Sequence, residues 1–226
     1  MTAPTSSPAA PATTLSLDVW SDVVCPWCFI GLANLDAALA RFAHAGSVAV
    51  QLHSFQLDPS APVRDEQPLV ERLAEKYGTS VAQIRDSQAR IVALGAERGI
   101  DFRFDQAVGG NTFDAHRLLH LAARHHRQLE LKRRLGRAYF TDGEAIGEPD
   151  TLRRAALDVG LDAEEVDALL AGDAFARDVR ADIDHARSIG VSGVPFFVAD
   201  GRLAVSGAQP PDVLLGLLEE AWATRP

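Results

Sequence analysis

The spacing of the hydrophobic residues changes twice along this chain of 226 residues, from a strand pattern to a helix pattern and back. Leu15, Leu17 and Val19 alternate with other residues, which is the period of a half-buried strand. A helical spacing of three or four follows from residue 26 to about residue 42, and alternation returns over residues 48–52. The chain therefore opens as strand, helix, strand.

The middle of the chain carries helix signals and almost no strand signals. It follows a proline-rich stretch and includes a capping box at Ser80–Gln83. We expect helices near residues 81–99, 113–126, 129–140, 149–159 and 163–170. This helical block of roughly 120 residues is the size of a small domain.

Strand patterns return near the C-terminus. Val194–Val198 and Leu203–Val205 flank Asp200-Gly201, a pair suited to a tight hairpin turn. Pro195 stands at the start of the first of these strands, where the missing N–H of a proline is tolerated. A last helix is expected from residue 211 to about residue 223.

The predicted fold class is therefore α/β, with a strand-helix-strand half and a strand-strand-helix half that flank a large all-helical insertion. One domain is formed by residues 14–60 and 188–226, and the insertion by residues 61–187. Residues 1–13 are small, proline-rich and uncharged, which predicts a disordered tail.

Composition excludes two classes of partner. The net charge of −9 leaves no basic surface for a nucleic acid. Charges interrupt every hydrophobic run before about 18 residues, so we expect no membrane segment and a cytoplasmic protein. In a reducing compartment, a lone cysteine pair is more often catalytic or sensing than structural.

Two cysteines, Cys25 and Cys28, stand three residues apart where the first predicted helix begins. A thiol pair at this spacing can close into a disulfide and reopen. Unpaired N–H groups at a helix N-terminus stabilise a thiolate, so we expect a lowered pKa at Cys25 and assign it as the attacking nucleophile. Cys28 is then the more buried thiol with the higher pKa, and it resolves the mixed disulfide. Pro26 and Trp27 are expected to modulate this redox couple.

A zinc site is the main alternative for a Cys-x-x-Cys motif. A structural zinc site needs four ligands, and the chain has no second such motif. His116 and His120 are spaced i, i+4 on a predicted helix, but Arg117 follows His116 where a zincin has a glutamate. We therefore expect no metal.

With these motifs the chain resembles the DsbA-like branch of the thioredoxin-fold superfamily, and within it the FrnE-type dithiol-disulfide isomerases or oxidoreductases. The likeness extends from about residue 15 to residue 222. It rests on five blocks, which are Val24–Gly31, Phe55–Pro59, Asn111–Arg117, Gly193–Val198 and Val205–Gln209.

The resemblance implies a thioredoxin-like fold with a helical insertion. It also implies a cis Val194–Pro195 bond beside the cysteines, with the backbone of Val194 pairing with the substrate. His116 and Arg117 fall on one helix face, which lines a substrate groove, is solvated or packs within the insertion. Because Trp27 stands where the DsbA pattern has histidine, we expect a couple less oxidising than the periplasmic oxidants.

The function implied is exchange of thiols and disulfides on a protein, a peptide or glutathione. It requires no cofactor beyond the redox-active Cys25–Cys28 disulfide, with glutathione as a candidate co-substrate. One alternative is a glutathione-dependent isomerase or kappa-type glutathione transferase, although such enzymes usually carry serine at the nucleophile position. Another is a redox-regulated holdase or binding module. The sequence leaves the oligomeric state and the direction of exchange open.

Overall fold

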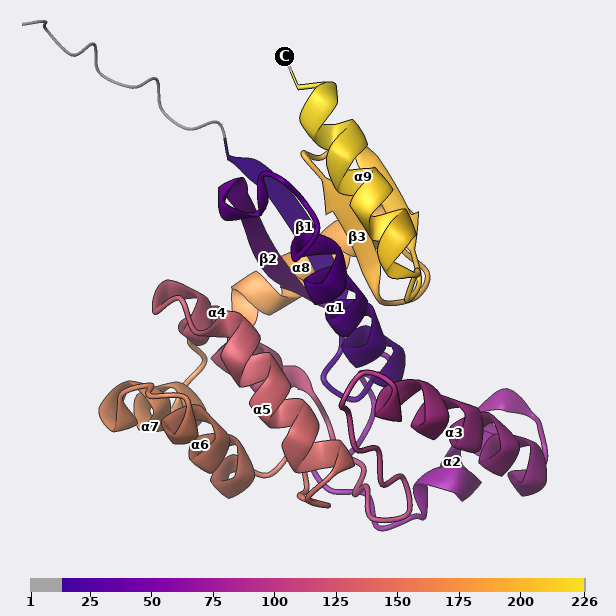
Figure 1. Ribbon diagram of the computed structural model, residues 1–226. Helices are drawn as coiled ribbons and strands as arrows, with labels where there is room; N and C mark the ends of the chain where they lie inside the picture. The colour runs from indigo at the N-terminus through magenta and orange to yellow at the C-terminus, as the bar shows by residue number, and fades with distance from the viewer. Residues whose placement is uncertain (1–13, 226) are drawn as a thin grey trace, which may run out of the picture.

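Four strands form one mixed sheet in the computed structural model, which describes residues 14–225 (Figure 1). They are β1 (Leu15–Ser21), β2 (Val48–Ser54), β3 (Phe196–Ala199) and β4 (Leu203–Ser206). The order across the sheet is β2-β1-β3-β4. β1 runs parallel to β2 and antiparallel to β3, and β3 is antiparallel to β4. The tail predicted at residues 1–13 lies outside the described residues.

The hairpin between β3 and β4 turns at the predicted dipeptide. Asp200 has a φ of 49° and Gly201 a φ of 64°, so both adopt the left-handed conformation. The N–H of Arg202 donates to the carbonyl oxygen of Ala199 at 3.0 Å, so Asp200 and Gly201 are the central residues of the turn. β3 and β4 pair on either side of it, which confirms the predicted hairpin.

Helices cover both faces of the sheet. α1 (Pro26–Leu39) and α9 (Pro211–Ala223) pack on the face that buries the alternating residues of β1 and Phe197 of β3. The other face carries α8 (Ala176–Ser188), where Ala186 packs with Trp20. A 3-10 turn (Ala45–Ser47) precedes β2.

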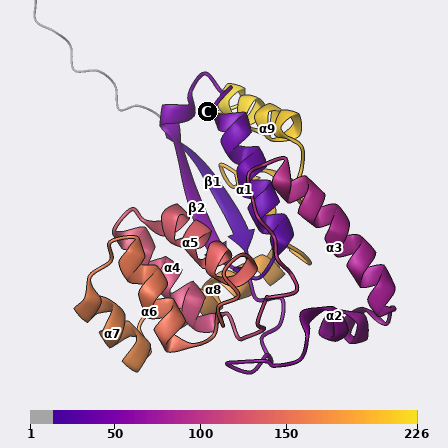
Figure 2. The ribbon, with the colours of Figure 1, turned by 60° about the horizontal axis from the view of Figure 1, so that its bottom comes forward.

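The insertion consists of two groups of helices, one on either side of the start of α1 (Figure 2). One group is α2 (Leu69–Tyr77) and α3 (Val81–Ala96), and the other is α4 (Phe113–Arg124), α5 (Gln128–Phe140), α6 (Pro149–Asp158) and α7 (Ala163–Ala171). The capping box at the start of α3 is confirmed. Ser80 Oγ accepts a hydrogen bond from the backbone N–H of Gln83, and the side-chain Oε1 of Gln83 accepts one from the backbone N–H of Ser80. α2 and α8 are additional to the helices expected from the sequence.

α1 connects the two larger hydrophobic cores of residues 14–225. Phe29 and Ile30 belong to the core of the insertion, whereas Leu32 and Leu35 belong to the core of the sheet. Most of α1 is therefore buried, and Trp27 in its first turn is one of its exposed residues. α5 approaches closely because Gly136 has no side chain, since a Cβ there would lie 2.1 Å from the ring of Phe29.

α8 lies within the predicted insertion, residues 61–187, but packs on the sheet. The indole Nε1 of Trp20 donates to the carbonyl oxygen of Asp182 at 3.2 Å, and the Asp182 carboxylate lies 2.8 Å from Nδ1 of His53. α8 thus packs on both β2 and α4 and joins the predicted insertion to the sheet. In the described part of the chain, every helix is too short or too polar to cross a bilayer.

Candidate active site

Cys25 lies where the chain leaves β1 and begins α1. It is the N-cap of α1 in an extended conformation, and Pro26 is the first helical residue. Proline suits that position because its φ is already helical and its missing N–H would have no partner there. Cys28 follows one turn later with its N–H donating to the carbonyl oxygen of Cys25 at 3.1 Å. Both thiols are free.

The segment that precedes β3 faces Cys25. The Val194–Pro195 peptide bond is cis, and the Sγ of Cys25 lies 3.5 Å from the carbonyl oxygen of Val194, 169 residues away. Gly31 permits this approach, because a Cβ there would lie 2.9 Å from Cγ of Pro195 and 3.3 Å from Cζ of Phe197. The glycine of the CPWCFIG block thus lets α1 pack against the proline segment.

A groove of about 530 Å³ opens beside Cys25. Pro26, Trp27 and Val194 line it together with residues of α2 and α3. Cys25 is 4% exposed and borders the groove, whereas Cys28 is fully buried and does not border it. Trp27 is 41% exposed. The two thiols therefore differ in their access to an incoming molecule.

Three buried ionisable side chains lie beneath the cysteines. Asp22 accepts hydrogen bonds from the N–H groups of Val23 at 2.7 Å and of Leu57 at 2.8 Å, and its Oδ1 lies 3.2 Å from Nε2 of His116. Lys132 donates to the backbone carbonyl oxygen of Asp22 at 2.5 Å. These contacts connect the residues just before Cys25 to α4 and α5.

Burial and pairing act in opposite directions on these charges. Burial disfavours the Asp22 carboxylate, but the hydrogen bond and the charge of His116 outweigh it and lower the pKa of Asp22. Burial lowers the pKa of Lys132, although the neighbouring Cys28 and Asp22 favour its charged form. The charged form of Lys132 and a thiolate at Cys28 therefore stabilise each other.

The cysteines differ in pKa in the direction opposite to the one expected. A hydrogen bond with Cys28, together with burial, raises the pKa of the Cys25 thiol well above its usual range. Burial also disfavours a thiolate at Cys28, but the hydrogen bond from Cys25 and the charge of Lys132 lower the pKa of Cys28. The physical reason is that the two thiols share one hydrogen bond, in which Cys25 keeps its proton and Cys28 accepts, and that the charge of Lys132 favours a thiolate at Cys28. The expectation of a lowered pKa at Cys25 considered only the helix N-terminus.

His116 and Arg117 lie apart from the groove. His116 is buried against Asp22. Arg117 donates to the carbonyl oxygens of Ala174 at 2.8 Å and of Gly172 at 2.6 Å, which ties α4 to the connection between α7 and α8. The contacts of Arg117 correspond to packing within the insertion, one of the roles considered for this face, whereas the contact of His116 with Asp22 joins α4 to the segment between β1 and α1.

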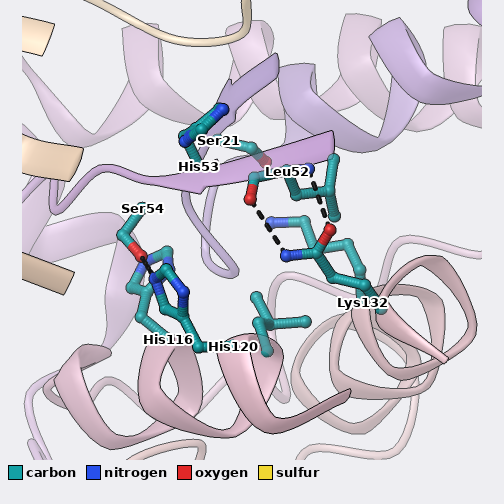
Figure 3. A pocket seen from close by; sticks show the side chains of 9 residues that line it. Ser21, Leu52, His53, Ser54, His116, His120 and Lys132 are labelled. Atoms are coloured by element: carbon teal, nitrogen blue, oxygen red, sulfur yellow. Dashed lines mark hydrogen bonds between the residues drawn. The ribbon is translucent and has the colours of Figure 1, made fainter. Parts of the chain in front are cut away.

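A second polar cluster lies between β2 and α4. Ser54 Oγ lies 3.2 Å from Nε2 of His120, and the side-chain amide of Gln128 both donates to and accepts from the backbone of Leu52 at 2.9 Å (Figure 3). Gln128 thereby pairs the free edge of β2. The space between these side chains is too small for a water molecule. In residues 14–225, no group of three His, Cys, Asp or Glu side chains is arranged to hold a metal ion.

Asp22 and Lys132 are site residues that the sequence reasoning did not select. Asp22 carried a weak signal, since it directly follows the first strand. Lys132 carried a clearer one. It lies four residues after Gln128 and three before Leu135, on the face of α5 that is buried, and a lysine on such a face is unusual.

The fold and the dithiol define a thioredoxin-like protein with a helical insertion. Residues 16–219 match the model of the DSBA-like thioredoxin domain, so the chain belongs to the DsbA-like thioredoxin domain family. The structure of a probable DsbA oxidoreductase from Streptomyces coelicolor is similar with a TM-score of 0.89 and 41% identity, over 94% of this chain and 92% of that one. Family and relative indicate oxidoreductase or isomerase activity of the DsbA type, on thiol or disulfide substrates.

Two more distant relatives share most of the chain. The uncharacterized protein YwbO of Bacillus subtilis (strain 168) is 26% identical over 212 residues, which are 88% of this chain and 94% of YwbO. The cytosolic disulfide reductase DsbM from Pseudomonas aeruginosa has a TM-score of 0.64 and 21% identity, over 93% of this chain and 100% of that one. At that identity the likeness to DsbM is one of fold.

Proposed function

We propose that this protein is a thiol-disulfide oxidoreductase or isomerase in which Cys25 is the nucleophile and Cys28 the resolving thiol. The observation that carries the proposal is the difference in access between the two sulfurs. Cys25 borders the groove and faces Val194, whereas Cys28 is fully buried one helical turn further on. A substrate sulfur that enters the groove meets Cys25 first.

The reaction proceeds by two exchanges. The thiolate of Cys25, formed as its proton passes to the partner thiolate of Cys28 or to solvent, attacks one sulfur of a substrate disulfide. A bond forms between Cys25 and that sulfur, and the other substrate sulfur leaves and takes up a proton. Cys28 then gives up its proton and its thiolate attacks the sulfur of Cys25. The bond between Cys25 and the substrate breaks, and the second substrate sulfur leaves and takes up that proton. The substrate disulfide is reduced and the Cys25–Cys28 pair is oxidised, and the reverse sequence oxidises a dithiol.

The segment at Val194 and Pro195 positions the substrate in this proposal. Its carbonyl oxygen already lies beside the Sγ of Cys25, so a chain that pairs with the backbone of Val194 holds its sulfur next to the nucleophile. Pro26 and Trp27 form the adjoining wall of the groove and modulate the couple.

Glutathione is the co-substrate that we propose for restoring the dithiol, in the cytoplasm. A solved structure of DsbM is described with GSH, and that protein is named a cytosolic reductase. Its fold is the one found in this chain, with a TM-score of 0.65. The specific FrnE-type assignment belongs to this proposal and rests on the motif blocks.

The experiment that tests the proposal compares Cys25→Ser with Cys28→Ser. Reduced protein is mixed with a disulfide substrate, and both thiol release and adducts are followed by mass spectrometry. We expect Cys28→Ser to accumulate a mixed disulfide at Cys25, since nothing resolves it, and Cys25→Ser to lose exchange. Normal exchange by Cys25→Ser would exclude the assigned nucleophile.

A further inference from the structure

The groove beside Cys25 has the size and the lining of a site for a small organic molecule. Its volume of about 530 Å³ lies in the range of roughly 300–1,000 Å³ that is typical of such sites. Apolar side chains from α2, α3, α5 and a connecting loop form much of its wall, and they include Leu69, Leu73, Ile84, Ile91, Phe104 and Phe140.

The charged groups at the groove are already paired. The charged side chains that line it are Asp22, Asp58, Arg72 and Lys76. Arg72 Nη1 lies 3.1 Å from Oδ2 of Asp65, and Lys76 Nζ donates to the carbonyl oxygen of Leu57 at 3.0 Å. Asp58 Oδ1 accepts hydrogen bonds from the backbone N–H and from the hydroxyl group of Ser60. The apolar wall therefore offers more to a ligand with an apolar body than the charged groups offer to a ligand with several charges. Glutathione, the proposed co-substrate, needs only to reach Cys25 and not to fill the groove.

The side-chain amide of Gln88 differs from the other polar groups that line the groove. Gln88 is on α3 and lines the groove, and its side-chain Nε2 is buried without a hydrogen-bond partner among residues 14–225. A buried donor without a partner is uncommon in folded proteins and calls for a specific explanation. A small rotation of the Gln88 side chain would turn this amide into the groove, where a carbonyl oxygen on a ligand would accept a hydrogen bond from it.

We infer that the groove holds a small, uncharged organic disulfide or thiol with an apolar body and a carbonyl group. This inference rests on the proposed function and names the substrate class of the same site. The apolar body lies among the side chains of α2 and α3, the carbonyl oxygen meets Gln88, and the sulfur reaches Cys25. Exchange follows the two steps given above, with one substrate thiol released at each step.

Three disulfides distinguish this substrate class from its competitors. N,N′-diacetylcystamine and N,N′-dibenzoylcystamine are both uncharged and release 2-acylaminoethanethiols, so they differ chiefly in a methyl against a phenyl group and not in the leaving thiol. Oxidised glutathione represents a charged peptide. The second-order rate of reaction with the reduced full-length protein is measured for each.

We expect the dibenzoyl compound to react at least about tenfold faster than the diacetyl compound, because its ring is buried in the groove. Tyr77 is 64% exposed and lines the groove, so Tyr77→Ser should lower this ratio without unfolding the protein. Gln88→Leu should slow both acyl compounds at the same time. Val92→Ser, on α3 but outside the groove lining and 39% exposed, is the matched control and should leave all rates unchanged.

Two results would overturn the inference, and they are distinguishable. A dibenzoyl-to-diacetyl ratio near one, or oxidised glutathione reacting as fast as the dibenzoyl compound, would show that exchange occurs but that the groove does not select an apolar body. Failure of all three disulfides to react with Cys25 would remove the proposed function together with this inference.

Discussion

Lys132 donates a 2.5 Å hydrogen bond to the backbone carbonyl oxygen of Asp22, and both residues are buried. The two are 110 residues apart, one on α5 and the other three residues before Cys25. The bond holds a cation under the dithiol, and that charge is one of the causes that lower the pKa of Cys28.

Replacing Lys132 by methionine should make the dithiol more reducing. Loss of the cation destabilises the thiolate in the reduced protein, so the disulfide becomes relatively more stable and the reduction potential falls, by about 30 mV for each tenfold change in the equilibrium constant. Equilibration with glutathione redox buffers measures the change. Lys76→Met, at the groove rim, is the control and should shift the potential less. A potential that stays the same or rises in Lys132→Met contradicts this role.

Asp22→Asn should destabilise the protein by about 1–3 kcal/mol, because the amide cannot accept from all the N–H donors that face the carboxylate. The pKa of Asp22 is lowered in the folded state, so its contribution is present above the ordinary value near 3.8 and is lost as the pH falls below it. Denaturant unfolding at several pH values measures the difference between the proteins. We expect that difference to shrink in acid, and a constant difference would argue against an ionised Asp22.

His53 should make stability fall at alkaline pH. Its two ring nitrogens lie 2.8 Å from the carboxylates of Asp18 and Asp182. Burial disfavours its charge, but these carboxylates raise the pKa of His53 to about 9. The stabilisation is therefore fully present below the ordinary pKa near 6.5 and is lost as the pH rises through 9.

We expect His53→Gln to be less stable than the natural protein by about 1–2 kcal/mol at neutral pH, after allowance for solvent screening, and nearly equal to it above pH 10. Unfolding midpoints between pH 6 and pH 10 test this. Because the ring of His53 stacks on Trp20 at 4.6 Å, tryptophan fluorescence gives a second readout. Parallel pH profiles for the two proteins would disprove the charged histidine.

Gly31→Ala should slow exchange by about tenfold or more, because the new Cβ pushes against Pro195 and moves the Val194 carbonyl away from Cys25. The strain should also cost about 1–3 kcal/mol of stability. Rates with a small disulfide and unfolding curves separate the two effects. Gly216→Ala is the matched control, since a Cβ there meets nothing within 4 Å and the helix α9 should gain stability. Equal exchange rates in both variants would refute the positioning role.

Local pattern alone determined the order of the elements. The alternation of Leu15, Leu17 and Val19, the capping box at Ser80 and the turn at Asp200-Gly201 each depend on residues close together in the chain, and each is found in the structure. The same local information placed the cysteines at a junction of strand and helix. α2 and α8 were missed because nearly half of their residues are charged, and packing on neighbouring helices and on the sheet stabilises them.

Only the tertiary structure decided the electrostatics of the site. His116 meets Asp22 across 94 residues, and the bond from Lys132 to Asp22 spans 110. The pKa of a buried thiol depends on the charges and dipoles within a few ångströms of its sulfur, whatever their separation along the chain. The sequence therefore identified which two sulfurs lie at the junction, and the folded arrangement around Cys28 decided where their negative charge is stabilised.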